Sequence, residues 1–421
     1  MQVDALALHV VQVAAMTLRE LSDLVGLHDL ELKSARAVYV VASMIGVLFA
    51  GSTVLTPLYV IYKQQFGFSQ ITLTLIYAVY VIGNLASLLF FGHVSDAIGR
   101  RRTAAPAMAL AVVSTLIFLF AQGTGWLFVA RALSGLAIGI GAGTGTAWLS
   151  ELIAKKNKAR AAMIATSTNF FGCAIGALMS GLLAQYAPWP LHLSFVVYLV
   201  ALLVTGALVF FARETVAHRV QRFTQLSLRP RLSVPRALRA QFVAPAVTGA
   251  GAMALVGFYA ALAPSILAQE LHEPDHAVAG ALFFELAIVL AGSIVATQKI
   301  SSRSAMLWGL ALMLPSVVLL VSAQVMASIA IMLLATALCG LAAGLGYRGS
   351  LQAVNLIAPE NRRAEMVSNY LVWVFCGNAF PVIGIGVLST LANPIMASMA
   401  FAAMIISFAL LALFSGSKHA R

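Results

Sequence analysis

The stretch GHVSDAIGRRR, from Gly92 to Arg102, lies between two long apolar segments. ITLTLIYAVYVIGNLASLLFF precedes it and TAAPAMALAVVSTLIFLFA follows it. One acidic residue, Asp96, and three consecutive arginines therefore occupy a short polar interruption in a strongly hydrophobic region. Such an interruption is typical of a loop between two membrane-spanning helices, and the same pattern recurs along the chain.

The composition places the whole chain in the membrane. Of its 421 residues, 61% are hydrophobic and 10% are charged, whereas a soluble domain is usually about 45–50% apolar and about 25% charged. Apolar runs of about 20 residues recur, and a helix of that length crosses about 30 Å of hydrocarbon. We therefore expect a polytopic membrane protein.

Twelve spans can be marked, and a longer polar segment divides them into six and six. The expected organisation is a cytoplasmic N-terminal segment (1–37), an N-terminal six-helix half (38–212), a cytoplasmic linker (213–241), a C-terminal six-helix half (242–414) and a cytoplasmic tail (415–421). The spans are expected at about 38–62, 70–92, 103–122, 126–149, 161–186, 191–212, 242–268, 277–297, 304–323, 327–347, 366–390 and 393–414.

Basic residues predict the orientation. All of the 26 lysines and arginines except Lys63 and Arg131 lie in the odd-numbered polar segments, counted from the N-terminus. Basic loops stay on the cytoplasmic side, so both termini are predicted to be cytoplasmic. This bias accounts for the net charge of +12 without a nucleic-acid partner, and it allows contact with anionic lipid.

The two halves resemble each other in sequence. SGLAIGIG at 134–141 matches CGLAAGLG at 339–346, and LIAKKN at 152–157 matches LIAPEN at 356–361. Each pair falls near the end of the fourth span of its half, and halves with an even number of spans insert the same way up. Two parallel repeats with a substrate site between them are one architecture of secondary transporters.

The opening stretch fits the pattern G-x-x-x-D-x-x-G-R-R through Gly92, Asp96, Gly99, Arg100 and Arg101. In a loop between the second and third spans, this pattern resembles the signature of the major facilitator superfamily. The resemblance implies an all-α membrane protein whose twelve transmembrane helices form two parallel six-helix repeats around a central cavity. It also implies a conformational latch in which the arginines pair with a carboxylate, and Glu151, at the cytoplasmic end of the fourth span, is the nearest candidate. The alternative is a tight turn with topology-setting arginines.

Arg131 and Gly135 fit the R-x-x-x-G pattern that the family often carries in the fourth span. A bare arginine inside a span is costly, so Arg131 is a candidate for proton coupling or for binding an anionic group. An arginine that extends to water at the outer helix end is the alternative. One family pattern is missing, because Ala177 stands where proton-driven exporters often have proline, and this weakens an antiporter assignment.

Glu285 is the carboxylate expected deepest inside a span, in AGALFFELAIVLAG. Ionisation of a carboxylate in hydrocarbon is costly, and acids at such positions are candidates for a functional role. We therefore take Glu285 as a proton-coupling candidate. The alternative is a neutral glutamic acid that forms a hydrogen bond to a neighbouring helix.

These features predict a secondary active transporter, with proton-coupled efflux of small amphiphilic molecules as its task. A proton-coupled metabolite importer and a non-transporting membrane sensor are the alternatives. By family resemblance, spans 1, 4, 7 and 10 form the cavity and supply sparse polar groups: Ser52, Thr53, Thr56, Tyr59, Thr146, Trp148, Thr248, Tyr259 and Thr336.

No enzymatic motif, phosphate-binding loop or metal-ligand spacing is visible, and Cys173, Cys339 and Cys376 lie in apolar runs. We therefore expect no cofactor, no metal and no enzyme activity. The expected partners are a small-molecule substrate, protons and membrane lipid. We expect a monomer in the inner membrane of a bacterium.

Overall fold

A computed structural model describes residues 34–91, 94–153, 158–216 and 232–418. Within these residues, twelve helices are long and apolar enough to cross a membrane. The expected twelve-span, all-helical fold is thereby confirmed. Gly92 and most of the expected N-terminal segment lie outside the described residues.

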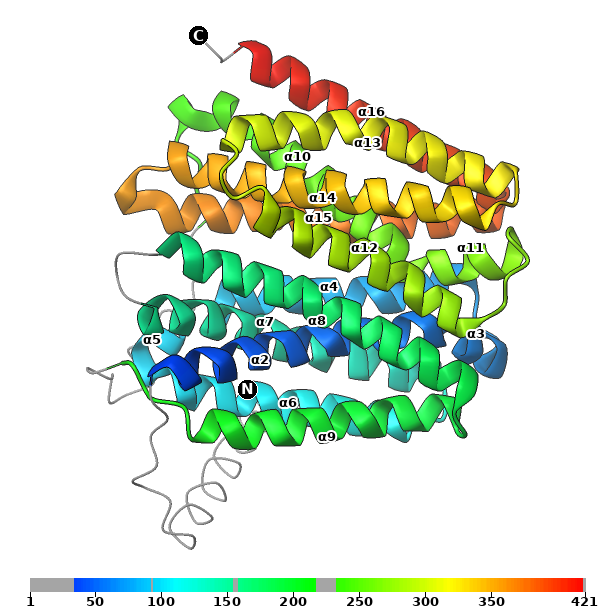
Figure 1. The fold of residues 1–421 in the computed structure, drawn as a ribbon, viewed down its shortest axis with the longest axis horizontal. Helices are drawn as coiled ribbons and strands as arrows, with labels where there is room; N and C mark the ends of the chain where they lie inside the picture. The colour runs from blue at the N-terminus through cyan, green and yellow to red at the C-terminus, as the bar shows by residue number, and fades with distance from the viewer. Residues whose placement is uncertain (1–33, 92–93, 154–157, 217–231, 419–421) are drawn as a thin grey trace, which may run out of the picture.

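The first six spans come from seven helices, and with the short helix α5 between the second and third spans they form the lower group in Figure 1. Their bounds are α2 Ser34–Thr53, α3 Leu55–Phe66, α4 Gln70–Phe91, α5 Val94–Ile98, α6 Arg100–Leu119, α7 Thr124–Leu152, α8 Lys158–Tyr186 and α9 Pro190–Phe210. We call this group the N half.

The last six spans form the upper group, which we call the C half (Figure 1). Its elements are η3 Arg236–Leu238, α10 Arg239–Ala261, α11 Ala263–Gln269, α12 His276–Ala296, α13 Ser302–Val325, α14 Ile329–Ile357, η4 Glu360–Arg362, α15 Arg363–Leu391 and α16 Pro394–Lys418. The first turn of this half, η3, begins at Arg236, inside the expected linker.

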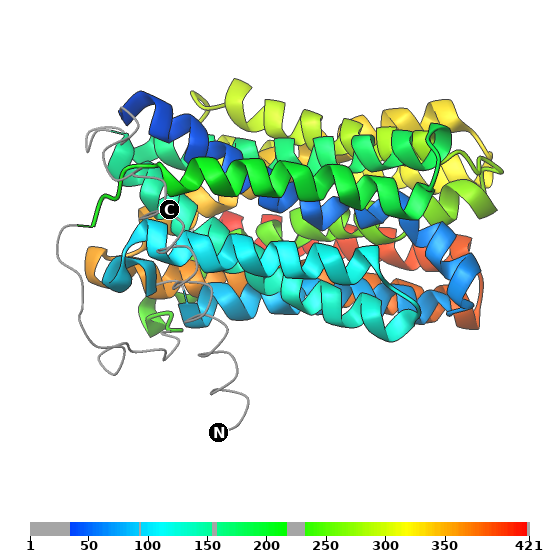
Figure 2. The same cartoon turned by 90° about the horizontal axis from the view of Figure 1, so that it is seen from below.

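The long helices of both halves run side by side along one axis (Figures 1 and 2). Helix α5, the start of α2 and the end of α16 lie at the left of Figure 1, and we call this the inner end. The α3–α4, α8–α9 and α11–α12 connections lie at the opposite end, which we call the outer end. The positive-inside rule predicts that the inner end faces the cytoplasm, because the arginine-rich loops gather there.

Spans 1 and 7, which occupy equivalent places in the two halves, are both interrupted near the outer end. Helix α2 gives way to α3 at Val54, and α10 gives way to α11 at Leu262. Pro57 and Pro264 follow these interruptions. Proline has no backbone N–H, so each removes one hydrogen bond to a carbonyl four residues earlier. Each span therefore has an outer segment, α3 or α11, that is separated from its longer inner part.

The two halves meet through α8 against α12 and α4 against α15. A Cβ atom at Gly280 would lie 2.6 Å from the carbonyl oxygen of Ala177 and 3.0 Å from the Cα of Gly181, so only glycine permits this approach. The Tyr77 hydroxyl donates to Asn378 Oδ1 at 2.6 Å, and the His276 N–H donates to Gln185 Oε1 at 3.0 Å. Most of these residues lie toward the outer end of their helices, so these contacts close the bundle there.

Selective labelling tests the predicted orientation. Ser233→Cys lies in the basic connection at the inner end, and Tyr186→Cys lies at the outer end, where Tyr186 is 74% exposed. In intact cells, a membrane-impermeant maleimide should label Tyr186→Cys and should reach Ser233→Cys only after permeabilisation. The unsubstituted chain is the control, because it carries the partly exposed Cys376 together with the buried Cys173 and Cys339. Labelling of Ser233→Cys in intact cells would reverse the orientation.

Candidate functional site

A sharp turn at Gly99 positions the polar residues that gather at the inner end. Gly99 lies between α5 and α6 with a φ of +110°, a region that side-chain-bearing residues rarely enter. This turn sets the first residues of α6, Arg100 and Arg101, against the inner ends of α7 and α9. The glycine of the sequence motif therefore has a direct conformational role.

Arg100 connects two carboxylates. Its Nη2 lies 2.5 Å from Glu151 Oε1 and its Nε 3.2 Å from Glu151 Oε2, which is a two-point contact. Its Nη1 lies 2.5 Å from Asp96 Oδ1 and donates to Ser95 Oγ at 2.6 Å. The Arg100 side chain is 5% exposed. The structure thus brings together Asp96, Arg100 and Glu151, all within the N half.

A third carboxylate, Glu214, was missed by the sequence reasoning. Its two oxygens accept the backbone N–H groups of Arg100 at 2.9 Å and Arg101 at 3.2 Å. A carboxylate at a helix N-terminus is favoured by the unpaired N–H groups and the helix dipole. Glu214 is the one acidic residue in the expected linker, 213–241, among seven arginines. An acidic residue alone among arginines was the feature from which Glu214 could have been identified in the sequence.

The beginning of the linker is held against the same cluster. The Trp148 indole N–H donates to the carbonyl oxygen of Arg213 at 2.9 Å, and the Thr215 hydroxyl donates to Glu151. The Arg101 guanidinium lies over the ring of Phe210 at 5.3 Å and donates to the Phe210 carbonyl oxygen at 3.0 Å. We call Asp96, Arg100, Glu151 and Glu214 the inner cluster; Arg101 contributes to it through its backbone.

Arg131 is enclosed within the N half and does not extend to water. Its exposed fraction is 0%, its Nη1 donates to the Ser52 carbonyl oxygen at 2.8 Å and its Nη2 to the Tyr59 hydroxyl at 2.8 Å. The rings of Tyr59 and Tyr80 lie 5.5 and 5.3 Å from the guanidinium carbon. Cation–π contacts of this kind offset part of the cost of burying the charge. The alternative of an arginine extended to the surface is therefore wrong.

Glu285 lies near the middle of α12 and keeps one oxygen without a partner. Oε2 is buried and forms no hydrogen bond. In the described structure neither Glu285 nor Arg131 forms an ion pair, so the two do not serve as each other's counter-charge in this state. The residue as a whole is only partly buried. Its role toward protons stays a prediction.

The cavity-lining candidates are almost all enclosed in this conformation. Ser52, Thr53, Thr56, Tyr59, Trp148, Thr248, Tyr259 and Thr336 are buried, while Thr146 is exposed. Thr53 donates to the Cys173 carbonyl oxygen at 2.7 Å, and Thr336 donates to the Tyr259 hydroxyl at 3.1 Å. Thr53 and Thr336 thus join neighbouring helices, whereas Thr248 bonds within its own helix and Thr56 Oγ1 has no partner. The role of the candidates toward a substrate stays a prediction.

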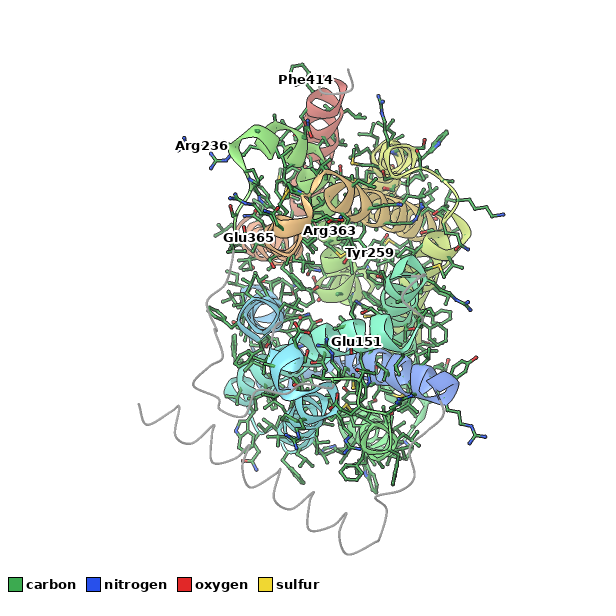
Figure 3. The ribbon with its side chains drawn as sticks, turned by 90° about the vertical axis from the view of Figure 1, so that its left-hand side faces the viewer. Glu151, Arg236, Tyr259, Arg363, Glu365 and Phe414 are labelled. Atoms are coloured by element: carbon green, nitrogen blue, oxygen red, sulfur yellow. The ribbon has the colours of Figure 1, made fainter. Side chains whose placement is uncertain are left out.

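Figure 3 looks onto the inner end and shows where labelled residues of the two halves lie. Glu151 lies in the N half, Arg363 and Glu365 lie in the C half, and Tyr259 lies near the seam between the halves. Among the described residues, no group of three His, Cys, Asp or Glu side chains is placed to hold a metal ion. The arrangement provides a charged cluster at one end and isolated ionisable groups in the interior.

The contacts of the inner cluster predict that Glu151→Gln destabilises the protein. Glu151→Gln removes the charge that faces a nearly buried Arg100, and hydrogen bonds to charged groups contribute about 1.5–3 kcal/mol. We expect a lower melting temperature in detergent, whereas Glu360→Gln, at an exposed position on the same end, should leave it nearly unchanged. Equal melting temperatures for the two variants would show that the Arg100–Glu151 pair adds no stability.

Comparisons with known proteins agree with this architecture. The family model of the Major Facilitator Superfamily matches residues 41–303. The inner membrane transport protein YnfM of Escherichia coli is 32% identical over 142 residues, which cover 33% of each chain. The multidrug resistance protein MdtL of a Shewanella species is 25% identical over 152 residues, 36% of this chain and 38% of that protein. The matched segments span about a third of these relatives.

A solved structure supports the fold over nearly the whole chain. The bacterial homologue of the human lysosomal transporter Spinster, in an inward-facing and unoccupied conformation, superposes with a TM-score of 0.68. It shares 14% identity and the match covers 91% of this chain and 95% of that one. At this identity the likeness concerns the fold alone. With the family model matched over more than half of its length, the chain belongs to the Major Facilitator Superfamily.

Proposed function

We propose that this membrane protein is a proton-coupled exporter of small amphiphilic molecules, working by alternating access in a bacterial inner membrane. The observation that carries the proposal is the position of Glu285. It lies on α12, the helix of the C half that packs against α8 of the N half. Its charge is therefore carried by a helix that joins the two halves.

The contacts that close the outer end also support the proposal. Gly280 makes the close contact with α8. Glu285 follows five residues later on the same helix, about 7.5 Å along its axis and about 140° around it, so it lies beside that contact and not in it. Separation of α8 and α12 would change the surroundings of the carboxyl group and admit water. Ionisation would then cost less, and a proton would be released.

The proposed substrate class and direction rest on the expected cavity residues and on two relatives. The expected cavity residues are hydroxyls and aromatics with few charges, which suits amphiphilic or aromatic compounds. One relative is named a multidrug resistance protein, and another is named an inner membrane transport protein. The first name supports export of drug-like molecules, and the second supports transport across the inner membrane. We further propose that the monomer is the transporting unit.

Transport by Glu285→Gln tests the coupling. Glutamine imitates the protonated carboxyl group, so the variant should fold, bind substrate and exchange it downhill. In proteoliposomes with an imposed pH gradient, it should lose accumulation against a gradient and lose the pH dependence of transport. The matched control is Glu270→Gln, which removes a carboxylate between α11 and α12 at the outer end.

Two results would contradict the proposal. If Glu285→Gln concentrates substrate with the wild-type pH profile, Glu285 has a structural role and coupling lies elsewhere. If wild-type transport requires ATP and persists without an ion gradient, the chain is not a secondary transporter.

A further inference from the structure

A pocket of about 320 Å³ opens at the outer end between the two halves. The N half contributes Lys63, Ser69 and Gln70, and the C half contributes Leu262, Ser265, Ile266, Gln269, Ile385, Ser389, Thr390, Pro394 and Ser398. Small-molecule sites usually have volumes of about 300–1,000 Å³. The pocket is therefore large enough for a small organic ligand.

The side chains that line the pocket favour a ligand with a negative charge and hydroxyl groups. Lys63 is its one charged residue, and five serine or threonine hydroxyls and two glutamine amides supply further polar atoms. The hydroxyls of Ser389, Thr390 and Ser398 already donate to Gly386 and Gln324, so they are left as acceptors. Lys63 Nζ donates to Gln70 Oε1 at 2.8 Å. An ammonium group has three N–H donors, so this bond leaves two for another acceptor. An anionic group near Lys63 and hydroxyls against the rest of the lining would satisfy these groups together.

The pocket also connects the parts of the outer end that would have to move. Lys63 lies on α3, the outer segment of the interrupted span 1. Ser265 and Gln269 lie on α11, the outer segment of span 7, and α3 contacts α11. A ligand held between these segments would bridge the halves where they are closed. A ligand that binds one conformation better than another shifts the population toward it.

We propose that this pocket binds a small hydroxylated organic acid and that its occupation holds the outer end closed. The carboxylate pairs with Lys63, and the ligand hydroxyls bond to the serine, threonine and glutamine side chains of the lining. The second part of the proposal rests on alternating access, whereas the binding itself does not.

Gluconate and sorbitol provide matched probes, since both are six-carbon polyols and only gluconate carries a carboxylate. Isothermal titration of the purified full-length protein in detergent should show gluconate binding at least tenfold tighter than sorbitol. Lys63→Gln should weaken gluconate binding about tenfold or more, because a hydrogen bond to a charged group is lost. Lys299→Gln removes an exposed positive charge at the inner end and should leave the affinity unchanged.

A second variant keeps the test informative if Lys63→Gln does not fold. Ser69→Trp places a bulky group at an exposed lining position and should block gluconate by occupying the pocket. Equal affinities for gluconate and sorbitol, an unchanged affinity in Lys63→Gln, or gluconate binding that survives Ser69→Trp would overturn the site.

Spin-label distances across the outer end test the conformational effect. Gluconate should reduce the population with a separated outer end in the wild type and have no effect in Lys63→Gln. Binding without any change in that population would remove the second part of the proposal. Gluconate binding that depends on Lys63 in a protein without pH-driven transport would leave the pocket in place and reject the exporter function.

Discussion

The close approach of α8 and α12 at the outer end is the constraint on which the arrangement of the two halves depends. Lipid offers no hydrophobic driving force between helices, so contact relies on close packing of small residues and on hydrogen bonds. The close packing comes from Gly280, which lies against Ala177 and Gly181. The hydrogen bond is the one from the His276 N–H to Gln185. The same helix, α12, carries Glu285, the residue that we propose couples transport to protons.

The charged groups at the inner end have a different task, because their contacts lie within one half. Arg100 joins α6 to α7 through Glu151, and Glu214 joins the end of the sixth span to the start of α6. Two-point contacts of this kind fix the relative positions of helices. A half stiffened in this way moves as a unit, which rocking between two conformations requires. The first residues of the linker belong to that unit.

Much of this architecture could be predicted from the sequence, because hydropathy and charge bias act over whole segments. The twelve spans follow from length and composition, and Gly99 and the Arg100–Glu151 pair follow from a local motif with a strong conformational requirement. Glu214 was missed because its partners are backbone N–H groups more than a hundred residues away, which no spacing reveals. The enclosure of Arg131 by Tyr59 and Tyr80 depends in the same way on packing between spans. The interruptions at Val54 and Leu262 had a visible signal in Pro57 and Pro264, but the outer pocket had none, since two halves build it.

The most direct measurement of the central claim, that the halves separate and rejoin at the outer end, is a reversible cross-link between α4 and α15. A Cβ atom at Gly386 would lie 3.1 Å from the Cβ of Thr74, close to the separation of about 3.5–4.5 Å found in disulfides. In a background that carries Cys376→Ala, the pair Thr74→Cys and Gly386→Cys should form a disulfide on oxidation, stop transport, and regain it on reduction. The double variant kept reduced is the control, because it carries both substitutions without the cross-link. Full transport by the cross-linked protein, or failure of the pair to cross-link, would contradict the account.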